Sequence, residues 1–219
     1  MGNQYRIAPN GDLRIVNMTL RELVRTAYGL HETQLYGGPK WFDVDRWSIE
    51  AKVGRSSPDS SRETTRQRLQ ALLGERFQLA SHQESRWLSV LVLVPAKGGH
   101  KLAVSKPGQE PAMRGAGRGE IRAKSTRVEA LSSVLSGLLG RIVTDRTGLQ
   151  GQYDFELRWS PDATTERLPG QPANMAPADP GDGPTLYKAI QEQLGMKLES
   201  KRMAVNSLVI DRALRPTGN

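Results

Sequence analysis

The sequence predicts an α+β fold made of two tandem, structurally similar modules. Helix start and stop signals alternate along the chain with short apolar runs that have the period of strands. The order of these elements in residues 13–95 returns in residues 121–211: strand, helix, strand, glycine-containing turn, strand, helix and final strands. We therefore expect each module to be a small sheet packed with two helices.

Composition sets the expected boundaries. We place the first module at residues 4–95, a flexible basic linker at 96–124 and the second module at 125–214. The linker range has six glycines, two prolines and no aromatic residue, which is typical of a mobile segment. Residues 160–184 have six of the thirteen prolines and predict a disordered loop within the second module.

Four helices are predicted from their end signals. Capping boxes begin at Thr19, Ser60 and Thr126, each with a glutamate three residues later, and a fourth helix opens at Thr185 after a proline. Apolar residues spaced three and four apart follow each start. The predicted stops are glycines, which adopt left-handed backbone angles freely: Gly29, Gly74, Gly140 and Gly195.

Strands are predicted between the helices, from period-two alternation or from short apolar runs. They are residues 34–36, 46–53, 78–81, 87–94, 141–144, 153–159, 197–200 and 206–211. Residues 88–94 are apolar except for Ser89, which indicates the most buried strand.

The net charge is concentrated in one short range. The sequence has 31 Lys and Arg against 23 Asp and Glu, a formal net charge of +8. Residues 96–124 contribute seven basic and two acidic side chains, so five of the eight charges lie in the expected linker. Because that range lacks aromatic residues for base stacking, the nucleic-acid alternative is weak, non-specific binding through the linker, with no specific nucleic-acid partner.

Several classes of site are excluded or unsupported. The chain has no cysteine, which excludes disulfides, thiolate nucleophiles and zinc sites with sulfur ligands. The longest apolar run, residues 88–95, is far shorter than the roughly 20 residues of a membrane-spanning helix. His31, His82 and His100 lack metal-ligand spacing with each other or with carboxylates, so we expect neither a metal nor a cofactor.

A hydrolase with an esterase-like Ser/His/Asp site is the main alternative function, with no catalytic residue assigned. The strand-to-helix elbow G-x-S-x-G is absent, and the serines of residues 132–136 lie on a helix whose apolar face is committed to packing. Only spatial neighbours would make such a site, for example His82 or His31 with a serine and Asp145 or Asp154. We therefore expect binding rather than catalysis.

Aromatic residues supply the candidate binding site. Eight of the twelve lie in the first half of the chain. The candidate binding residues are Tyr36, Trp41, Trp47 and Trp87. Packing in the core or at a domain interface is the other interpretation, because most tryptophans are simply buried. An aromatic patch, an open sheet edge or the cleft between the modules would recognise a partner without catalysis.

Specific motifs occur in both halves. The first half contains Asn17-Met-Thr-Leu-Arg-Glu-Leu23, Gly37-Gly-Pro39 and Glu75-Arg-Phe77. The second half contains Val143-Thr-Asp145-Arg-Thr-Gly-Leu-Gln-Gly151-Gln-Tyr-Asp-Phe155 and Ala189-Ile-Gln-Glu-Gln-Leu-Gly195. These motifs resemble a soil-associated family of unknown function that is expanded as paralogues in acidobacteria. The resemblance covers nearly the whole chain and carries over no catalytic residue.

The resemblance implies a location and a type of function. Members typically carry a signal peptide, and related domains occur at the C-terminus of penicillin-sensor-type membrane metallopeptidases. An extracytoplasmic location, periplasmic or secreted, is therefore expected, although no signal-peptide pattern precedes Gln4. Members usually open with a further strand, which we expect to be missing here. The module order is also similar to N-terminal domains of secretins and TonB-dependent receptors, which bind proteins. We thus expect a non-catalytic binding protein for a protein, peptide or small molecule.

Overall fold

The predicted mixed α+β class is confirmed. The computed structural model describes residues 4–8, 12–52, 62–115, 119–160 and 183–216. These residues form four α-helices and eleven strands in three sheets. Contacts divide the chain into unit 1, Met1–Trp87 with Ala204–Asn219, and unit 2, Leu88–Met203. This division differs from the expected modules, because the end of the chain belongs with its beginning.

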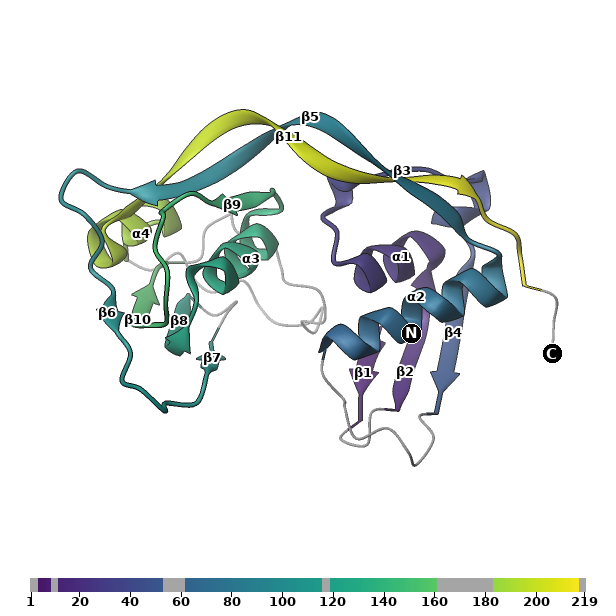
Figure 1. Ribbon diagram of the computed structural model, residues 1–219, viewed down its shortest axis with the longest axis horizontal. Helices are drawn as coiled ribbons and strands as arrows, with labels where there is room; N and C mark the ends of the chain where they lie inside the picture. The colour runs from purple at the N-terminus through teal and green to yellow at the C-terminus, as the bar shows by residue number, and fades with distance from the viewer. Residues whose placement is uncertain (1–3, 9–11, 53–61, 116–118, 161–182, 217–219) are drawn as a thin grey trace. The chain divides into compact units, whose positions relative to one another are not determined.

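Unit 1 combines a three-stranded antiparallel sheet, in the order β1-β2-β4, with two helices. Its elements are β1 (Gln4–Ile7), β2 (Leu13–Thr19), α1 (Leu20–Tyr28), η1 (Glu32–Gln34), β3 (Leu35–Gly37), η2 (Lys40–Asp43), β4 (Arg46–Ala51) and α2 (Arg62–Phe77). In Figure 1, β3 lies on one side of α1 and the three-stranded sheet on the other. Side chains from both sides and from the helices meet in one core, for example Ile15, Leu23, Leu35 and Leu73.

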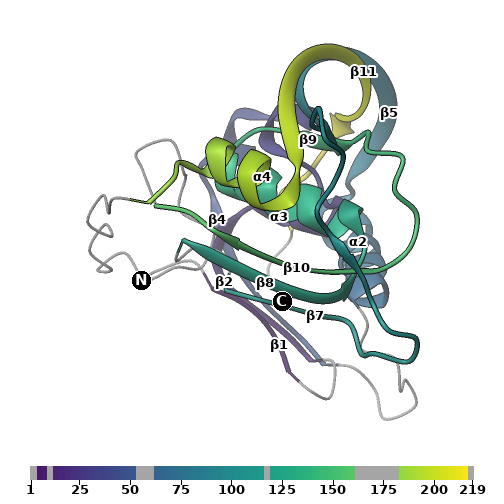
Figure 2. The same cartoon turned by 90° about the vertical axis from the view of Figure 1, so that its left-hand side faces the viewer.

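Unit 2 has a four-stranded sheet in the order β6-β10-β8-β7. Its elements are β6 (Ala103–Val104), β7 (Ala112–Arg114), β8 (Glu120–Thr126), α3 (Val128–Leu139), β9 (Val143–Asp145), β10 (Tyr153–Arg158) and α4 (Leu186–Leu194). Figure 2 shows α3 and α4 along one side of β10, β8 and β7. Ile121, Leu131, Leu157 and Ile190 are fully buried in the core between the helices and this sheet.

Two long strands contribute to both units: β5 (Ala80–Pro95) and β11 (Met196–Arg212). In unit 2, residues 91–93 of β5 pair in parallel with β9. In unit 1, residues 208–210 of β11 pair in parallel with β3. β5, the last strand of the first half of the sequence, thus pairs within unit 2. β11, the last strand of the second half, pairs within unit 1. The sequence predicted β5 and β11 as two separate strands each, because their middle residues are polar.

The expected flexible linker at residues 96–124 is not what the structure contains. This range holds β6, β7 and the first residues of β8, all paired in the sheet of unit 2. β6 and β7 have two and three residues, which is too short for an alternation to be recognised. Most of the predicted loop at 160–184 lies outside the described residues, but its ends meet where Ser160 N–H donates to the Pro184 carbonyl at 2.9 Å.

Helix ends follow the predicted signals in part. The Thr19 capping box is present, and Gly29, Gly140 and Gly195 have the left-handed backbone angles expected of helix stops. The Thr126 box is wrong, because Thr126 still belongs to β8 and Arg127 is the N-cap of α3. The stop at Gly74 is also wrong, since α2 continues to Phe77. The Ser60 box lies outside the described residues.

The two units share a strand irregularity. The β2–β4 register shifts between Ile15 and Met18, and the β8–β10 register shifts opposite Tyr153. A non-glycine residue with positive φ lies at each shift, Asn17 at 61° and Ser125 at 47°. The N–H of Asn17 donates to the Ser48 hydroxyl at 3.3 Å. The N–H of Ser125 donates to the carboxylate of residue 154 at 2.8 Å. β4 therefore occupies in unit 1 the place of β10 in unit 2.

Candidate binding site

Two of the candidate tryptophans come together in unit 1. The rings of Trp41, on η2, and Trp47, on β4, meet edge to face with centroids 6.4 Å apart. Trp47 also meets Phe77 at the end of α2, with centroids 5.1 Å apart. Both tryptophans are half-buried and pack against the core of unit 1. Core packing therefore accounts for part of each ring, and the rest of each ring is exposed.

The C-terminal segment reaches the same rings. The Leu214 N–H donates to the Phe77 carbonyl at 2.7 Å. The guanidinium of Arg215 lies over the Trp41 ring, 5.2 Å from its centroid, and pairs with the Asp45 carboxylate at 2.7 Å. Arg215 is 60 % exposed, so water weakens the ion pair. We call the combined area the Trp41 surface, and define it as Trp41, Val44, Asp45, Trp47, Phe77, Leu214 and Arg215.

The Trp41 surface combines exposed apolar side chains with a cavity. Val44 is 72 % exposed and Leu214 is 45 % exposed, so each offers apolar area to solvent. An open cavity of about 310 Å³ adjoins this surface. Its lining residues are Glu75, Arg76, Gln78, Leu214, Arg215 and Pro216. Apolar contact area and charges of both signs therefore meet within one unit.

The other two candidate aromatic residues lie elsewhere on the chain. Tyr36, on β3, is covered by the guanidinium of Arg86 at 4.0 Å, and Arg86 also pairs with Glu84. Trp87, on β5, is 67 % exposed. Among the described ring contacts, neither residue joins the Trp41–Trp47 pair. The four candidates therefore do not form a single patch through their recorded contacts.

The described contacts of His31, His82 and His100 do not include Asp145 or Asp154, the carboxylates named from the sequence for a hydrolase site. His82 Nδ1 lies 2.8 Å from Asp211, a residue of β11. His31 Nδ1 lies 3.1 Å from the Thr33 hydroxyl. His100, which lies in the expected linker, packs its ring against Tyr153 with centroids 5.7 Å apart. Within the described ranges, none of these contacts is a Ser/His/Asp arrangement.

Two serine hydroxyls of α3 make hydrogen bonds within the helix. The Ser133 hydroxyl donates to the Glu129 carbonyl at 3.0 Å. The Ser136 hydroxyl donates to the Ser132 carbonyl at 2.8 Å and accepts from the Val143 N–H at 2.8 Å. Ser132 is 4 % exposed. The Ser133 hydroxyl therefore bonds within α3, and the Ser136 hydroxyl joins α3 to β9.

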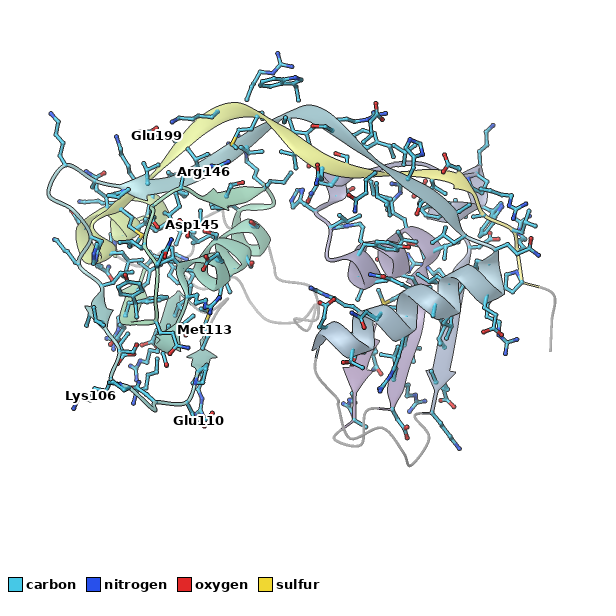
Figure 3. The ribbon with its side chains drawn as sticks, in the orientation of Figure 1. Lys106, Glu110, Met113, Asp145, Arg146 and Glu199 are labelled. Atoms are coloured by element: carbon cyan, nitrogen blue, oxygen red, sulfur yellow. The ribbon has the colours of Figure 1, made fainter. Side chains whose placement is uncertain are left out.

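A second cavity, of about 340 Å³, lies at the turn between β9 and β10. Figure 3 labels Asp145 and Arg146 at this turn. The Asp145 carboxylate accepts the N–H of Thr147 at 2.8 Å and its hydroxyl at 2.7 Å. The Thr147 hydroxyl accepts the Leu149 N–H at 3.2 Å. The Asp-Arg-Thr-Gly-Leu motif thus holds a tight turn, and it brings no aromatic residue to the cavity.

Arg122, a basic residue of the expected linker, is paired on the sheet of unit 2. Arg122 contacts Glu120 at 2.6 Å and Glu156 at 3.4 Å, and Arg158 contacts both glutamates too. The guanidinium of Arg158 lowers the pKa of Glu156. These four charges therefore balance one another.

Most of the residues around Trp41 carry no signal in the sequence. Leu214 and Arg215 lie about 170 positions from Asp45 in the sequence and belong to no recognisable motif. Val44 was a single apolar residue between two aspartates. Only Trp41 and Trp47 themselves indicated this area from the sequence.

The described residues contain no group of three or more potential metal ligands. No described helix has the length and apolar character needed to cross a membrane.

Comparison with known proteins identifies the family. A model of the family described as "Protein of unknown function (DUF3738)" matches residues 21–213, which is most of the chain. The chain belongs to this family. The match begins in α1 and ends just after β11, so the DUF3738 model spans both units and both long strands. No curated protein and no solved structure matches the chain.

Proposed function

We propose that this DUF3738 protein is an extracytoplasmic, non-catalytic binding protein that recognises a protein or peptide through the Trp41 surface. The observation that carries the proposal is the coincidence, within unit 1, of two half-buried tryptophans, exposed Val44 and Leu214, and an adjoining cavity. Tryptophan and arginine are the side chains that most often dominate binding energy at protein interfaces. The location rests on the resemblance to signal-peptide-bearing family members, as do the expected acidobacterial distribution and the link to membrane metallopeptidases.

The described carboxylates near candidate serines hold turns or strands, and the His82–Asp211 pair is exposed on both sides, at 55 % and 47 %. The Trp41 surface, in contrast, has aromatic area that the core does not fully use. Peptide recognition needs only such area and a few directional groups.

Comparative affinity capture tests the proposal. Immobilised full-length protein is incubated with extracytoplasmic and cytoplasmic fractions of the source cells, and bound proteins are quantified by mass spectrometry. Two variants are compared with it, Trp41→Ala and Val44→Asp. Val44 is exposed, so the aspartate adds a charge to the Trp41 surface without disturbing the core. We expect both variants to lose at least about tenfold of the same partners, equal to about 1.4 kcal/mol.

Tyr187→Ala is the matched control for that capture. Tyr187 is 41 % exposed on α4 of unit 2, so the substitution removes an exposed aromatic ring that is not part of the Trp41 surface. The Tyr187→Ala variant should capture the same proteins, in the same amounts, as the unaltered protein. If Trp41→Ala and Val44→Asp both capture an unchanged set of proteins, the proposal that the Trp41 surface binds them is wrong. Partners found only in the cytoplasmic fraction contradict the location.

We also infer that the two halves of the chain are copies of one module. Both have a positive-φ irregularity in the strand before the first helix, and both direct its N–H to the facing strand. Both then continue through a short strand that pairs in parallel with the last strand of the other half. Shared irregularities of this kind support duplication more strongly than the order of elements, because regular elements recur in unrelated folds.

A further inference from the structure

One of the protein's own side chains already lies on the Trp41 surface. The guanidinium of Arg215 lies over the Trp41 ring, and its Nε donates to the Asp45 carboxylate at 2.7 Å. The backbone holds Asp45 close to Trp41, because the Asp45 N–H donates to the Trp41 carbonyl at 2.9 Å. One guanidinium therefore contacts an aromatic ring and a carboxylate that belong to the same turn.

This pairing of ring and carboxylate suits arginine better than lysine. A guanidinium is planar, so it can lie over a ring and still direct N–H groups at a carboxylate. The lysine ammonium is a compact and strongly hydrated charge that lacks this geometry. The chemistry of Trp41 and Asp45 therefore fits a guanidinium in particular.

A second arginine of unit 1 shows how a firmly held guanidinium is bound. Arg21 lies over a ring and pairs with a carboxylate, as Arg215 does, but it also donates to the backbone carbonyls of Leu35 and Gly37, at 3.0 and 3.3 Å. Arg21 is 24 % exposed, whereas Arg215 is 60 % exposed. The described side-chain hydrogen bond of Arg215 goes to Asp45. Arg215 is therefore held more weakly than Arg21, because water competes for its contacts.

The segment that carries Arg215 is only partly packed. The N–H of Leu214 bonds to the Phe77 carbonyl, but the Leu214 side chain is largely open to solvent. Leu214 and Arg215 both line the open cavity of about 310 Å³. The Arg215 side chain thus borders open space as well as the Trp41 ring. It can leave the ring without removing a residue from the core of unit 1.

The corresponding positions of unit 2 lack this contact. The shared pairing of the last strands, β11 with β3 and β5 with β9, makes Arg215 correspond to Gly98. The shared places of β4 and β10 make Asp45 correspond to Gly151. Unit 2 therefore forms the corresponding strands with neither a guanidinium nor a carboxylate at these positions. The Arg215–Asp45 pair is thus not required by this arrangement of strands.

We propose that the Trp41 surface recognises an arginine side chain of its partner, and that Arg215 is an internal competitor which the partner arginine displaces. The partner guanidinium lies over Trp41 and donates to Asp45, in the place that Arg215 holds in the unbound protein. Apolar residues beside the partner arginine cover Val44, whose side chain is exposed. This inference rests on the proposed function and identifies the partner as an arginine-bearing peptide segment. Because the two arginines exclude each other, removing Arg215 raises the affinity for the partner.

Nuclear magnetic resonance of the full-length protein tests the competition. The probe is the synthetic peptide acetyl-Ala-Leu-Arg-Pro-amide, which has the sequence of residues 213–216. The chain has four tryptophans, and the indole N–H signal of Trp41 is the one that Trp41→Ala lacks. We expect the probe to shift this signal saturably, with a dissociation constant at least about threefold lower for Arg215→Ala than for the unaltered protein.

Arg14→Ala is the matched control for Arg215→Ala. Arg14 is another exposed arginine of unit 1 that pairs with a carboxylate, that of Glu50, so its replacement changes the net charge equally. The dissociation constant of the probe for Arg14→Ala should equal that for the unaltered protein.

Two further comparisons, both in Arg215→Ala, identify the group that is recognised. A probe with lysine in place of arginine keeps the charge but loses the planar group, so its dissociation constant should be at least about threefold higher. Adding Asp45→Asn should raise the dissociation constant of the arginine probe by a similar factor. Adding Glu50→Gln, which removes the same charge from β4, should leave it unchanged.

The affinity capture described above separates this proposal from the proposed function. We expect Arg215→Ala to capture more of the partners that Trp41→Ala loses. A loss of those partners in Arg215→Ala would make Arg215 part of the binding contact and overturn the proposal. So would equal dissociation constants for Arg215→Ala and Arg14→Ala, or for the arginine and lysine probes. If the probe binds none of these proteins while Trp41→Ala still loses its partners, the proposed function stands and only arginine recognition is wrong.

Discussion

The carboxylate of Asp154 joins three segments of unit 2. It accepts the Ser105 hydroxyl at 2.5 Å, the Ser125 N–H at 2.8 Å and the Gln109 side-chain amide at 3.2 Å. The Ser105 hydroxyl, then the Ser125 N–H, lowers the pKa of Asp154 below its ordinary value of 3.8. These contacts attach the segment around β6 to the positive-φ residue of β8. The ionised form of Asp154 is therefore the one that the fold stabilises.

Replacing this carboxylate should destabilise the protein in a pH-dependent way. We expect Asp154→Asn to lower Tm by a few degrees near neutral pH, because an amide offers one acceptor oxygen in place of two. The folded-state pKa is depressed, so the stabilisation is present above the ordinary pKa and disappears as pH falls through the folded-state value. The Tm values of the two proteins should therefore converge only as pH falls below the depressed folded-state pKa of Asp154, which lies under 3.8.

Glu110→Gln is the control for Asp154→Asn. Glu110 is an exposed carboxylate in the segment between β6 and β7, near Lys106 in Figure 3. Its replacement should leave Tm unchanged at every pH at which both proteins are folded. A Tm difference for Asp154→Asn that persists at low pH would show that the side chain acts through shape rather than through charge.

Among the elements, α3 begins without a side-chain cap. Its N-cap, Arg127, has the extended backbone angles of a capping residue but makes no side-chain hydrogen bond to the first turn. Arg127→Ser should therefore raise the free energy of unfolding by about 0.5–1 kcal/mol, because serine accepts a backbone N–H of that turn. Urea unfolding followed by circular dichroism measures the change.

Lys106→Ser is the matched control for the α3 cap. It removes the same charge from a loop, without a helix end nearby. A similar gain in both variants would attribute the effect to net charge instead of capping. The α1 capping box, with Thr19 N–H donating to the Glu22 carboxylate at 2.7 Å, is an example in this chain of an N-terminus that is already satisfied.

The elements that could be predicted are those whose signals are local. Thr19, Gly29 and Gly195 mark helix ends by their own chemistry, and β4 and β10 alternate clearly. The middle of β5 and of β11 has exposed polar residues such as Glu84 and Lys201, so no apolar period marks these stretches as strands.

Only those residues of the candidate site that lie close together in the sequence could be predicted. Trp41 and Trp47 lie six residues apart and were selected from the sequence. Arg215 and Leu214 join them through the position of β11, which depends on pairing with β3. Contacts that distant in sequence leave no pattern in a single chain, so reasoning from one sequence could not have placed them.

For the whole molecule, the pairing of β11 with β3 and of β5 with β9 makes each half dependent on the other. Leu208 and Ile210 of β11 are buried in the core of unit 1, and Leu91 and Leu93 of β5 are buried in that of unit 2. A fragment that ends before β11 therefore lacks part of the unit 1 core. Independent tandem modules would not show this dependence.

Fragment complementation tests that dependence. Residues 1–117 and 118–219 are expressed separately and together. We expect each fragment alone to lack a cooperative thermal transition, and the two together to copurify and regain it, because each supplies a strand that the other needs. Residues 4–95, the first module expected from the sequence, should fail to fold alone. A cooperative transition in that fragment would instead favour tandem modules.

The place of β11 also sets the order in which the protein can fold during its synthesis. Residues 204–212, which complete unit 1, leave the ribosome after every residue of unit 2. The first 87 residues therefore wait with an unpaired β3 and an open core while more than a hundred further residues are made. A premature stop codon after residue 203 would damage the unit that was translated first and spare most of the unit that was translated last.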